Sequence, residues 1–418
     1  MIQAGVAQSA NSETEHRVTG PSSHLHMQVY ETLEDLQQLR PEWEVLLDEF
    51  PHSTTFCTWE WLVPWWRAFG RVDRLCVIAA RDESSKLIGV APLSLTRQGF
   101  LGTELRVLRL LGDGSQDSDA LDLPVHSHYQ AEFSYALFQW LIEHSNAWDV
   151  CQFRTMPAQS PVGNRLLSHL RSVGWKVFTS TRPQTIIELP DTWEAYLKKL
   201  SSKERGKVGI RFRKLEKKYQ VEIRRCSENE LDSGLNSLFE LHAKHWQLRG
   251  LPGTLHVPER RQFYREMAQL LLSRNRLEFW LLSIDGKTVA AQFGLRHGDT
   301  VFSLQEGFDP LYSADSVGYV LRSQVLKRLI ADGIRRYDFL GGTDESKVRW
   351  GAEVKNYLNL EFAAPHTWGS IHLLLKYGSA GAKSWLRQNL PKSIWQTLKR
   401  LAGRGTARVE EGNERAQQ

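Results

Sequence analysis

The chain has few of the features that hold a protein together outside the cell or anchor it in a bilayer. Only four cysteines occur in 418 residues, at positions without the spacing of a disulfide framework or a metal site (Cys57, Cys76, Cys151, Cys226). They are expected to be reduced thiols. No apolar run approaches the roughly 20 residues that span a bilayer, and the first 20 residues lack the apolar core of a signal peptide. We therefore expect a cytoplasmic protein.

A strong excess of charge of one sign is also missing. The formal net charge is +5, and 24% of the residues are charged while 41% are hydrophobic. This balance is typical of a soluble globular protein. The net charge is too small to indicate DNA as a partner, so any electrostatic argument must rest on local clusters.

The length exceeds what one hydrophobic core usually organises, which indicates more than one domain. Residues 1–27 are polar and aperiodic and are predicted to be disordered. Residues 364–418 are predicted to form a basic amphipathic segment of short helices and a flexible tail. That segment can pack on the rest of the protein or lie on an anionic membrane surface.

The sequence between these ends contains a weak internal repeat, which predicts two domains over 28–189 and 190–363. In each, a helical region precedes a hairpin, a further strand, a loop, a helix and a last strand. The hairpins fall at 75–95 and 279–297, the helices at 135–145 and 319–333, and the last strands at 148–155 and 335–342. This order predicts an α/β fold made twice, each copy with a mixed sheet flanked by helices.

Three motifs of the second half resemble a known superfamily. They are GKTVAAQFGL at 286–295, LQEGFDPLYSADSVGYVL at 304–321 and GIRRYDFLGGTDESKVRWG at 333–351. They resemble the GNAT acyltransferases, more narrowly the CelD/BcsL group with its BioF2-like acetyltransferase domain, and also the related FemAB peptidyltransferases. The resemblance is good from about 190 to 362 and weaker from about 28 to 185. It implies tandem GNAT-like domains with mostly antiparallel sheets, of which the first is degenerate and the second catalytic.

The resemblance implies transfer of an acyl group from acyl-CoA to an amine or hydroxyl. Glu306, at the end of a strand, can serve as the base or can pair with a nearby arginine. Asp338 lies within a strand, where a carboxylate is costly to bury alone, so it is a site residue or half of a buried pair. Lys347 matches a lysine of FemAB-like substrate sites and is predicted to bind a phosphate or the carbonyl oxygen; otherwise it is a solvated lysine.

The predicted donor site is the start of the helix at 319–333. Ser316, Val317, Gly318 and Tyr319 lie there, and the free N–H groups of a helix start suit a phosphate. The GNAT resemblance places the pyrophosphate of coenzyme A at this position. One glycine stands where those enzymes have two spaced glycines, and Asp315 lies beside it. The alternative is a capped helix without a ligand.

The predicted acceptor side carries basic and aromatic residues. Residues 201–219 form a helix with a basic face, which is either a solvated surface or a wall for a polyanionic substrate. The residues predicted to bind the substrate are Lys203, Lys207, Arg211, His245, Trp246, Arg249 and Trp350. His242 and His245 have a spacing that can begin a metal site, but no third ligand follows, so no metal is predicted.

Three functions remain open. The first is an acyl-CoA-dependent transferase with a small-molecule or saccharide acceptor, which the resemblance associates with exopolysaccharide or cell-envelope synthesis. The second is a FemAB-like transferase that uses aminoacyl-tRNA, favoured by the basic helix and the missing glycine. The third is a non-catalytic binding or scaffold protein. The loop at 112–124 of the first half already fits the third, because it is acidic where a phosphate loop needs open amides.

Overall fold

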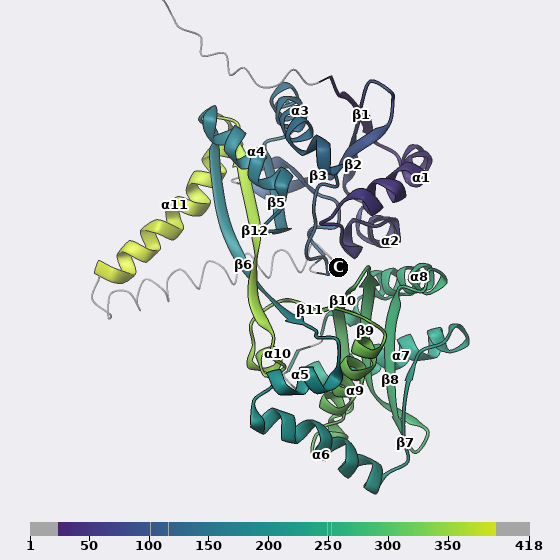
Figure 1. Cartoon of the computed structure of the whole chain (residues 1–418). Coiled ribbons are helices and arrows are strands. Elements are labelled where there is room, and N and C mark those ends of the chain that lie inside the picture. The colour runs from purple at the N-terminus through teal and green to yellow at the C-terminus, as the bar shows by residue number, and fades with distance from the viewer. Residues whose placement is uncertain (1–23, 101, 116, 249, 252, 390–418) are drawn as a thin grey trace, which may run out of the picture.

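The computed structural model describes residues 24–389, apart from 101, 116, 249 and 252. Within these residues, twelve strands form one sheet in the order β1-β2-β3-β4-β5-β12-β6-β11-β10-β9-β8-β7 (Figure 1). Neighbouring strands are antiparallel except for the parallel pairs β4–β5 and β10–β11. The predicted mixed, mostly antiparallel sheet is confirmed.

The first half of the chain contributes β1 to β6 with α1 to α4, and the second half contributes the remainder. The strands of the first half are β1 (His26–Tyr30), β2 (Arg74–Arg81), β3 (Leu87–Phe100), β4 (Thr103–Leu110), β5 (Val150–Pro157) and β6 (Lys176–Glu188). Its helices are α1 (Leu33–Glu49), α2 (Trp59–Phe69), α3 (Gln130–Glu143) and α4 (Pro161–Ser172). β1 begins two residues inside the segment 1–27 that was predicted to be disordered.

The second half repeats this order. Its strands are β7 (Val221–Arg225), β8 (Leu277–Ile284), β9 (Lys287–His297), β10 (Thr300–Phe308), β11 (Arg336–Gly341) and β12 (Glu353–Ala363). Its helices are α5 (Trp193–Lys199), α6 (Ser202–Lys218), α7 (Leu231–Gln247), α8 (Pro258–Ser273), α9 (Val317–Ala331), the short α10 (Glu345–Val348) and α11 (Trp368–Asn389). Both predicted hairpins form; Asp285 and Gly286 turn the second with φ angles of 50° and 80°, as a tight hairpin requires.

The last strand of each half crosses into the other half, which the sequence did not predict. β6 follows β5 in the chain but pairs with β11. β12 follows β11 but pairs with β5. The two long strands also pair with each other from Lys176–Ala363 to Ile186–Glu353, so they join the halves into one continuous sheet. The predicted boundary at 189 therefore falls just after a strand whose partners lie in the second half.

Helices cover both faces of the second half's sheet. A large core joins the first half to α7 and α8, and contacts such as Phe56–Phe302 and Trp61–Phe263 cross between the halves, with ring centroids 5.5 and 5.1 Å apart. A second core lies under α5, α6 and α9. The second core supports the start of α9, where the candidate site lies.

The C-terminal segment differs from the short helices that were predicted. α11 is one helix of 22 residues that extends away from the sheet (Figure 1). Trp368, Ile371, Leu374 and Leu375 are exposed on it, which is what peripheral contact with a membrane requires; that contact stays a prediction. Over the described part of the chain, no helix combines the length and apolarity needed to cross a bilayer. Residues 1–23 and 390–418 lie outside the described residues.

Replacing either of two glycines of the second half with alanine is expected to change the stability of the fold, in opposite directions. A Cβ at Gly206 in α6 would meet nothing within 4 Å, so Gly206→Ala should stabilise the fold by about 0.5–1 kcal/mol. A Cβ at Gly307 in β10 would lie 2.6 Å from the backbone nitrogen of His242 in α7. Gly307→Ala should therefore destabilise the fold by about 1–3 kcal/mol or more. Urea unfolding measures both; shifts of the same sign would contradict this packing.

Candidate functional site

The two parallel strands of the second half separate after a short paired region. β10 and β11 pair at three positions, from Thr300–Arg336 to Phe302–Asp338. Beyond Phe302, β10 continues along β9 with a bulge between Ser303 and Gln305. β11 continues along β6 with its own register shift. The strands diverge, and the end of β10 can offer backbone groups to a ligand between them.

A cavity of about 410 Å³ lies beside this divergence, at the start of α9. We call it the α9 pocket. It is lined by Arg211, His245, Ala291, Gln292, Glu306, Gly307, Phe308, Ser313, Ser316, Val317, Gly318, Tyr319, Leu321, Arg322, Ser346 and Arg349. These residues come from α6, α7, β9, β10, α9 and the segment around α10. The pocket is therefore built entirely from the second half of the chain.

The four residues predicted to bind the donor all line the α9 pocket. Ser316 adopts the left-handed conformation (φ 57°) that usually favours glycine, so the turn forms without the second glycine of the GNAT pattern. The carbonyl of Ser316 accepts from Val320 N, which leaves the N–H groups of 317–319 at the open end of the helix. Asp315 is paired with Lys218 at 3.0 Å and accepts from the hydroxyl of Tyr219, so its charge is offset. This helix start suits an anion.

Glu306 lies at the end of β10 and forms an ion pair with Arg322 of α9. The Glu306 side chain is 55% exposed and the Arg322 side chain 8%. Burial alone would lower the pKa of Arg322, but Glu306 and Tyr337 outweigh it and hold the pKa above its usual value. A half-exposed carboxylate facing the pocket can accept a proton, and a buried guanidinium behind it keeps a positive charge in place.

The base of the pocket is a polar network beneath Arg322. The guanidinium of Arg322 lies 5.0 Å from the ring centroid of Phe339. Gln292 on β9 donates to the hydroxyl of Tyr337 on β11. Burial raises the pKa of Tyr337, so this phenol keeps its proton at neutral pH. The network holds Arg322 and Glu306 at the point where the strands diverge.

Two arginines form a cationic wall around Tyr319. The guanidinium of Arg211 lies 4.4 Å from the Tyr319 ring centroid and that of Arg349 lies 5.5 Å away. Trp350 packs on Tyr319 with the ring centroids 4.4 Å apart and is buried, so it supports the pocket without lining it. Since three arginines and a helix start meet one carboxylate here, the pocket favours an anionic ligand.

The other basic residues predicted on α6 lie outside the pocket. Lys203 is exposed. Lys207 donates to Glu204 at 2.5 Å, and the Tyr319 hydroxyl also donates to Glu204. This pair lies next to the cationic wall, but of the predicted basic residues of α6 only Arg211 lines the cavity.

Asp338 is not brought together with Glu306, and Lys347 does not line the α9 pocket although its charge interacts with that of Glu306. Asp338 lines a different pocket on the opposite face of the sheet, because side chains alternate along β11 and Tyr337 packs in the core under α9. Lys347 donates to the carbonyls of Phe339 at 3.1 Å and Gly341 at 2.5 Å, and burial lowers its pKa. These bonds fix the end of β11.

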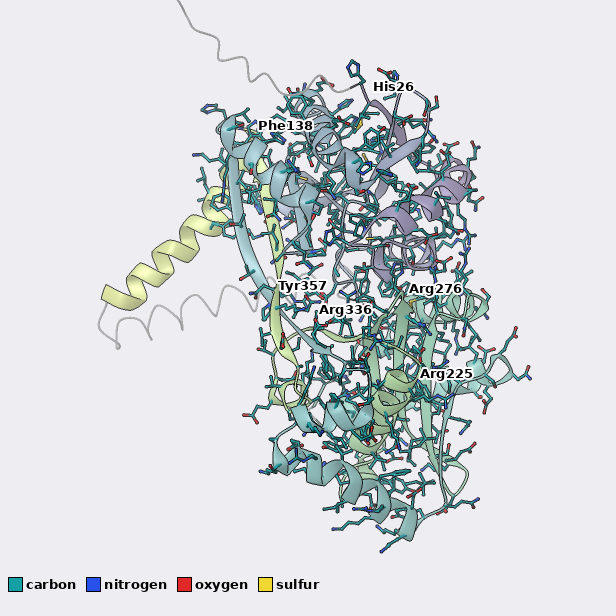
Figure 2. The ribbon with its side chains drawn as sticks, viewed as in Figure 1. His26, Phe138, Arg225, Arg276, Arg336 and Tyr357 are labelled. Atoms are coloured by element: carbon teal, nitrogen blue, oxygen red, sulfur yellow. The ribbon has the colours of Figure 1, made fainter. Side chains whose placement is uncertain are left out.

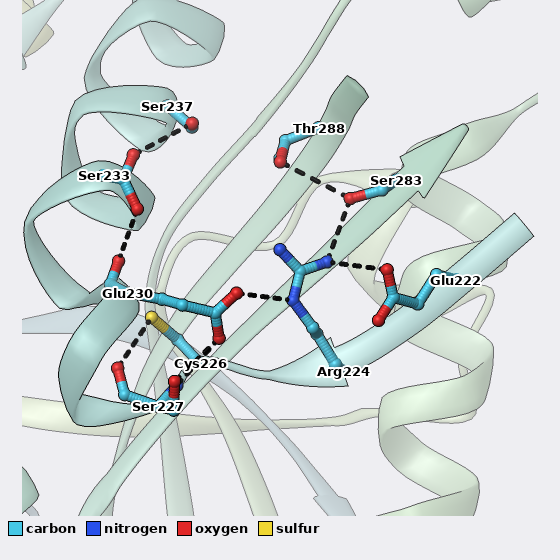
Figure 3. A network of polar contacts seen from close by, with 9 residues as sticks. All are labelled: Glu222, Arg224, Cys226, Ser227, Glu230, Ser233, Ser237, Ser283 and Thr288. Carbon is cyan, nitrogen blue, oxygen red and sulfur yellow. Dashed lines mark hydrogen bonds and ion pairs between the residues drawn. The ribbon is translucent and has the colours of Figure 1, made fainter. Parts of the chain in front are cut away.

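A capping box fixes the start of α7. The predicted substrate residues His245 and Trp246 lie near the other end of this helix. Ser227 and Glu230 bond reciprocally, and Arg224 on β7 binds Glu230 at 3.0 Å (Figure 3). His245, five turns along, lines the α9 pocket with its ring 4.8 Å from Phe308. Trp246 packs 6.4 Å from His245 but does not line the cavity. Arg249 lies outside the described residues.

Nine lining residues were not predicted from the sequence. They are Ala291, Gln292, Gly307, Phe308, Ser313, Leu321, Arg322, Ser346 and Arg349. Arg322 follows Gly318 by four residues, so helical spacing could have placed both on one face. Arg349 could not be placed from spacing, because it reaches the pocket only through the fold of 342–352. Among the described residues, no cluster of three or more His, Cys, Asp or Glu could hold a metal ion.

The matching loop of the first half forms hydrogen bonds to the second half. β4 and β5 are parallel as β10 and β11 are. The acidic loop after β4 carries Asp117, which accepts from the hydroxyl of Tyr264 at 3.2 Å. Asp119 accepts from Arg182 at 2.8 Å and from Gly341 N at 2.9 Å. The acidic residues therefore tie the halves together.

Burial of His242 beside the pocket predicts a loss of stability in acid. Burial, with smaller contributions from His245 and Arg260, lowers the pKa of His242 to about 4. An unfolded histidine titrates near pH 6.5. Between these values the unfolded chain binds a proton that the folded chain does not, so stability falls as pH falls. Between pH 7 and pH 4.5, we expect the free energy of unfolding of His242→Gln to fall by up to about 2 kcal/mol less than that of the wild type. Equal losses in urea unfolding would contradict this.

Comparisons with known proteins agree with this architecture. Residues 202–348 match the family model described as Acetyltransferase (GNAT) domain. A crystal structure of FemX is similar, with a TM-score of 0.57 and 12% identity over 80% of this chain and 97% of that chain. A conserved protein of unknown function from Bacteroides thetaiotaomicron VPI-5482 gives a TM-score of 0.51 and 12% identity over 81% of this chain and 100% of that chain. The curated proteins contain no match.

At 12% identity the two similar structures show the fold alone. With the repeated order of elements, the family match confirms the predicted fold class, tandem GNAT-like α/β. The match covers residues 202–348, which supply every lining residue of the α9 pocket except Arg349, so this part of the chain is similar to GNAT acetyltransferase domains.

Proposed function

We propose that the chain transfers an acyl group from acyl-CoA to an amine or hydroxyl in the α9 pocket. The proposal rests on three features that meet at one place in the fold. Diverging parallel strands, the open start of α9 and the half-exposed carboxylate of Glu306 meet around one cavity. An acyl transfer needs an anion site for the donor, a channel for its arm and a proton acceptor.

The proposed donor lies with its phosphates at the start of α9. The N–H groups of 317–319 and the arginines at 211 and 349 supply the positive field. The amide-rich arm then lies between β10 and β11, where the end of β10 can pair with it. Gly318 leaves room for this approach, since the atoms nearest to a Cβ there would be those of Phe308 at 3.4 Å or more.

The proposed reaction is a direct displacement. The acceptor's nitrogen or oxygen forms a bond to the thioester carbonyl carbon, and the carbon–sulfur bond breaks. Glu306 takes the acceptor's proton, and the thiol leaves with a proton from solvent. Arg322 stabilises the negative charge that develops at the carbonyl oxygen, since it is a buried cation lining the same cavity.

The acceptor is proposed to be a small molecule or saccharide of exopolysaccharide or cell-envelope synthesis. This part rests on the resemblance of the three motifs to the CelD/BcsL group. His245 and Phe308 give the pocket an aromatic side on which a sugar ring can pack. The alternative donor, aminoacyl-tRNA, is favoured by the exposed basic residues of α6, of which Lys203, Lys214 and Lys217 are examples.

A transfer assay separates the two donors and the non-catalytic possibility. The protein is incubated with radiolabelled acetyl-CoA and a panel of amino sugars, and in parallel with charged tRNA and the same panel. The proposal predicts labelled product and free thiol only with acetyl-CoA. Product from charged tRNA alone would show that aminoacyl-tRNA is the donor in place of acyl-CoA. No product with either donor, together with no binding of coenzyme A, would favour the non-catalytic binding protein.

A further inference from the structure

A second pocket of about 130 Å³ lies where the two halves meet, on the opposite face of the sheet from Glu306. We call it the junction pocket. It is lined by Pro51, His52, Ser53, Thr54, Ala120, Pro157, Gln159, Gln184, Ile186, Thr300, Phe302, Arg336, Asp338, Lys355 and Tyr357. Loops of the first half form its walls. Its floor is formed by the neighbouring strands β12, β6, β11 and β10.

The floor holds polar side chains of adjacent strands together with the apolar Ile186 and Phe302. Lys355 is the register partner of Gln184, and Asp338 is the partner of Ile186 on one side and of Phe302 on the other. Partners across a sheet share a face, so these side chains lie together. Tyr357 and Arg336 are labelled in Figure 2, near the middle of the molecule. The strand exchange between the halves creates this surface.

The deep end of the junction pocket has unused hydrogen-bonding capacity. Asp338 is 2% exposed and accepts from Leu340 N at 2.7 Å and from Gln184 Nε2 at 2.5 Å. A carboxylate has about four acceptor sites, so about two remain. Tyr357 is fully buried, and its hydroxyl has no hydrogen-bond partner among the described residues; the same holds for the buried hydroxyl of Ser53. Since buried polar groups are nearly always paired, this end suits a ligand that donates hydrogen bonds.

The deep end of the junction pocket carries a carboxyl group, whereas its mouth carries two cations. Burial raises the pKa of Asp338 to about 7, and a cation beside it would favour the charged carboxylate. At the mouth, Lys355 pairs with Glu188 at 2.7 Å and Arg336 pairs with Asp299 at 2.9 Å. Both pairs are nearly half exposed and therefore weak, so either cation can turn to an anionic ligand.

We propose that the junction pocket binds a small zwitterion, with its primary ammonium at Asp338 and Tyr357 and its acidic group at Lys355 and Arg336. A cavity of about 150 Å³ accommodates benzene, so this pocket holds a molecule of about six non-hydrogen atoms. The acidic group can be a carboxylate, as in an amino acid, or a phosphate. This site is independent of the acyl transfer proposed above.

Asp338 also stabilises the local backbone, and this structural role must be separated from ligand binding in the test. Leu340 has a left-handed backbone (φ 61°), and Asp338 Oδ1 accepts from its N–H. Asp338→Asn keeps that acceptor and removes the charge. Tyr357→Phe removes only the hydroxyl. Tyr30→Phe is the matched control, because Tyr30 is a buried strand tyrosine of the first half whose hydroxyl donates to Gln28.

Titration calorimetry of the full chain with four probes tests the proposal. β-Alanine and phosphoethanolamine carry both charged ends, whereas ethanolamine and inorganic phosphate carry one each. We expect one or both of the two-ended probes to bind at least about 10-fold more tightly than either single-ended probe; which of them binds identifies the acidic group. Equal binding of ethanolamine, or no binding of any probe, would overturn the proposal.

The variants then locate the binding. Asp338→Asn, Tyr357→Phe and Lys355→Ala should each weaken the two-ended probe by about 10-fold or more, as expected for a lost charged hydrogen bond. Tyr30→Phe and Glu306→Gln should leave it unchanged. Lys355 lies at the exposed mouth, so its variant gives an answer even if a buried variant unfolds. Unchanged binding in Lys355→Ala and in the folded buried variants would place the probe elsewhere and contradict the proposal.

Discussion

Replacing Glu306 with glutamine is expected to lower the turnover number by about 10²- to 10⁴-fold, the usual contribution of a general base. Glutamine keeps the size of the side chain and still accepts from Arg322, but it cannot take a proton from the acceptor. The carboxylate is half exposed and lines the pocket, so the change should not disturb packing. Donor affinity should change little, because the donor's phosphates lie at the start of α9 in this account.

The control for this variant is Glu222→Gln. Glu222 is also an exposed strand glutamate paired with an arginine, Arg224 at 3.3 Å, but it lies on the edge strand β7 outside the pocket (Figure 3). Its turnover should equal that of the wild type. Steady-state kinetics with acetyl-CoA and an active acceptor measure both. Full activity in Glu306→Gln would remove Glu306 as the base and leave its pairing with Arg322 as its role.

Gly318→Trp is expected to weaken donor binding by on the order of 100-fold or more, which corresponds to about 2.8 kcal/mol. Gly318 lies in the first turn of α9 and lines the pocket. The added indole ring would occupy the space beside Phe308 and cover the N–H groups of the helix start. Because the donor is excluded before chemistry begins, this variant and Glu306→Gln should fail at different steps.

Gly99→Trp is the control for the glycine variant. Gly99 lies in β3 of the first half, with nothing within 4 Å of the position of a Cβ. Calorimetry with coenzyme A should give the wild-type affinity for this control. If Gly318→Trp bound coenzyme A as tightly as the control, the donor site would lie elsewhere.

The local elements were predictable from the sequence because local patterns determine them. Asp285-Gly286 specifies a tight turn, and apolar spacing in 319–333 specifies α9. The exchange of β6 and β12 was not predictable, since it depends on pairing between residues about 180 apart, such as Lys176 and Ala363. Nothing in either strand's own pattern indicates which half supplies its partners.

The same distinction applies to the site. Ser316 to Tyr319 were predicted to form a helix start because a helix start has a local signature, and they line the α9 pocket. Asp338 was grouped with Glu306 because both are carboxylates at neighbouring strands. Which face each takes depends on register: a bulge between Ser303 and Gln305 in β10 intervenes before Glu306, while Asp338 keeps the face of its partner Phe302. Arg322 was missed because a buried arginine in a helix has no sequence signature of its own.

Hydrogen–deuterium exchange with and without acetyl-CoA tests directly whether the donor binds at the start of α9. We expect the donor to slow exchange of the amides in 313–322 and at the diverging end of β10, because it binds the open start of α9. The loop 111–124 of the first half should be unchanged, since its acidic residues already bind the second half. Protection confined to that loop, or no protection at the start of α9 while acetyl-CoA is bound, would contradict the account.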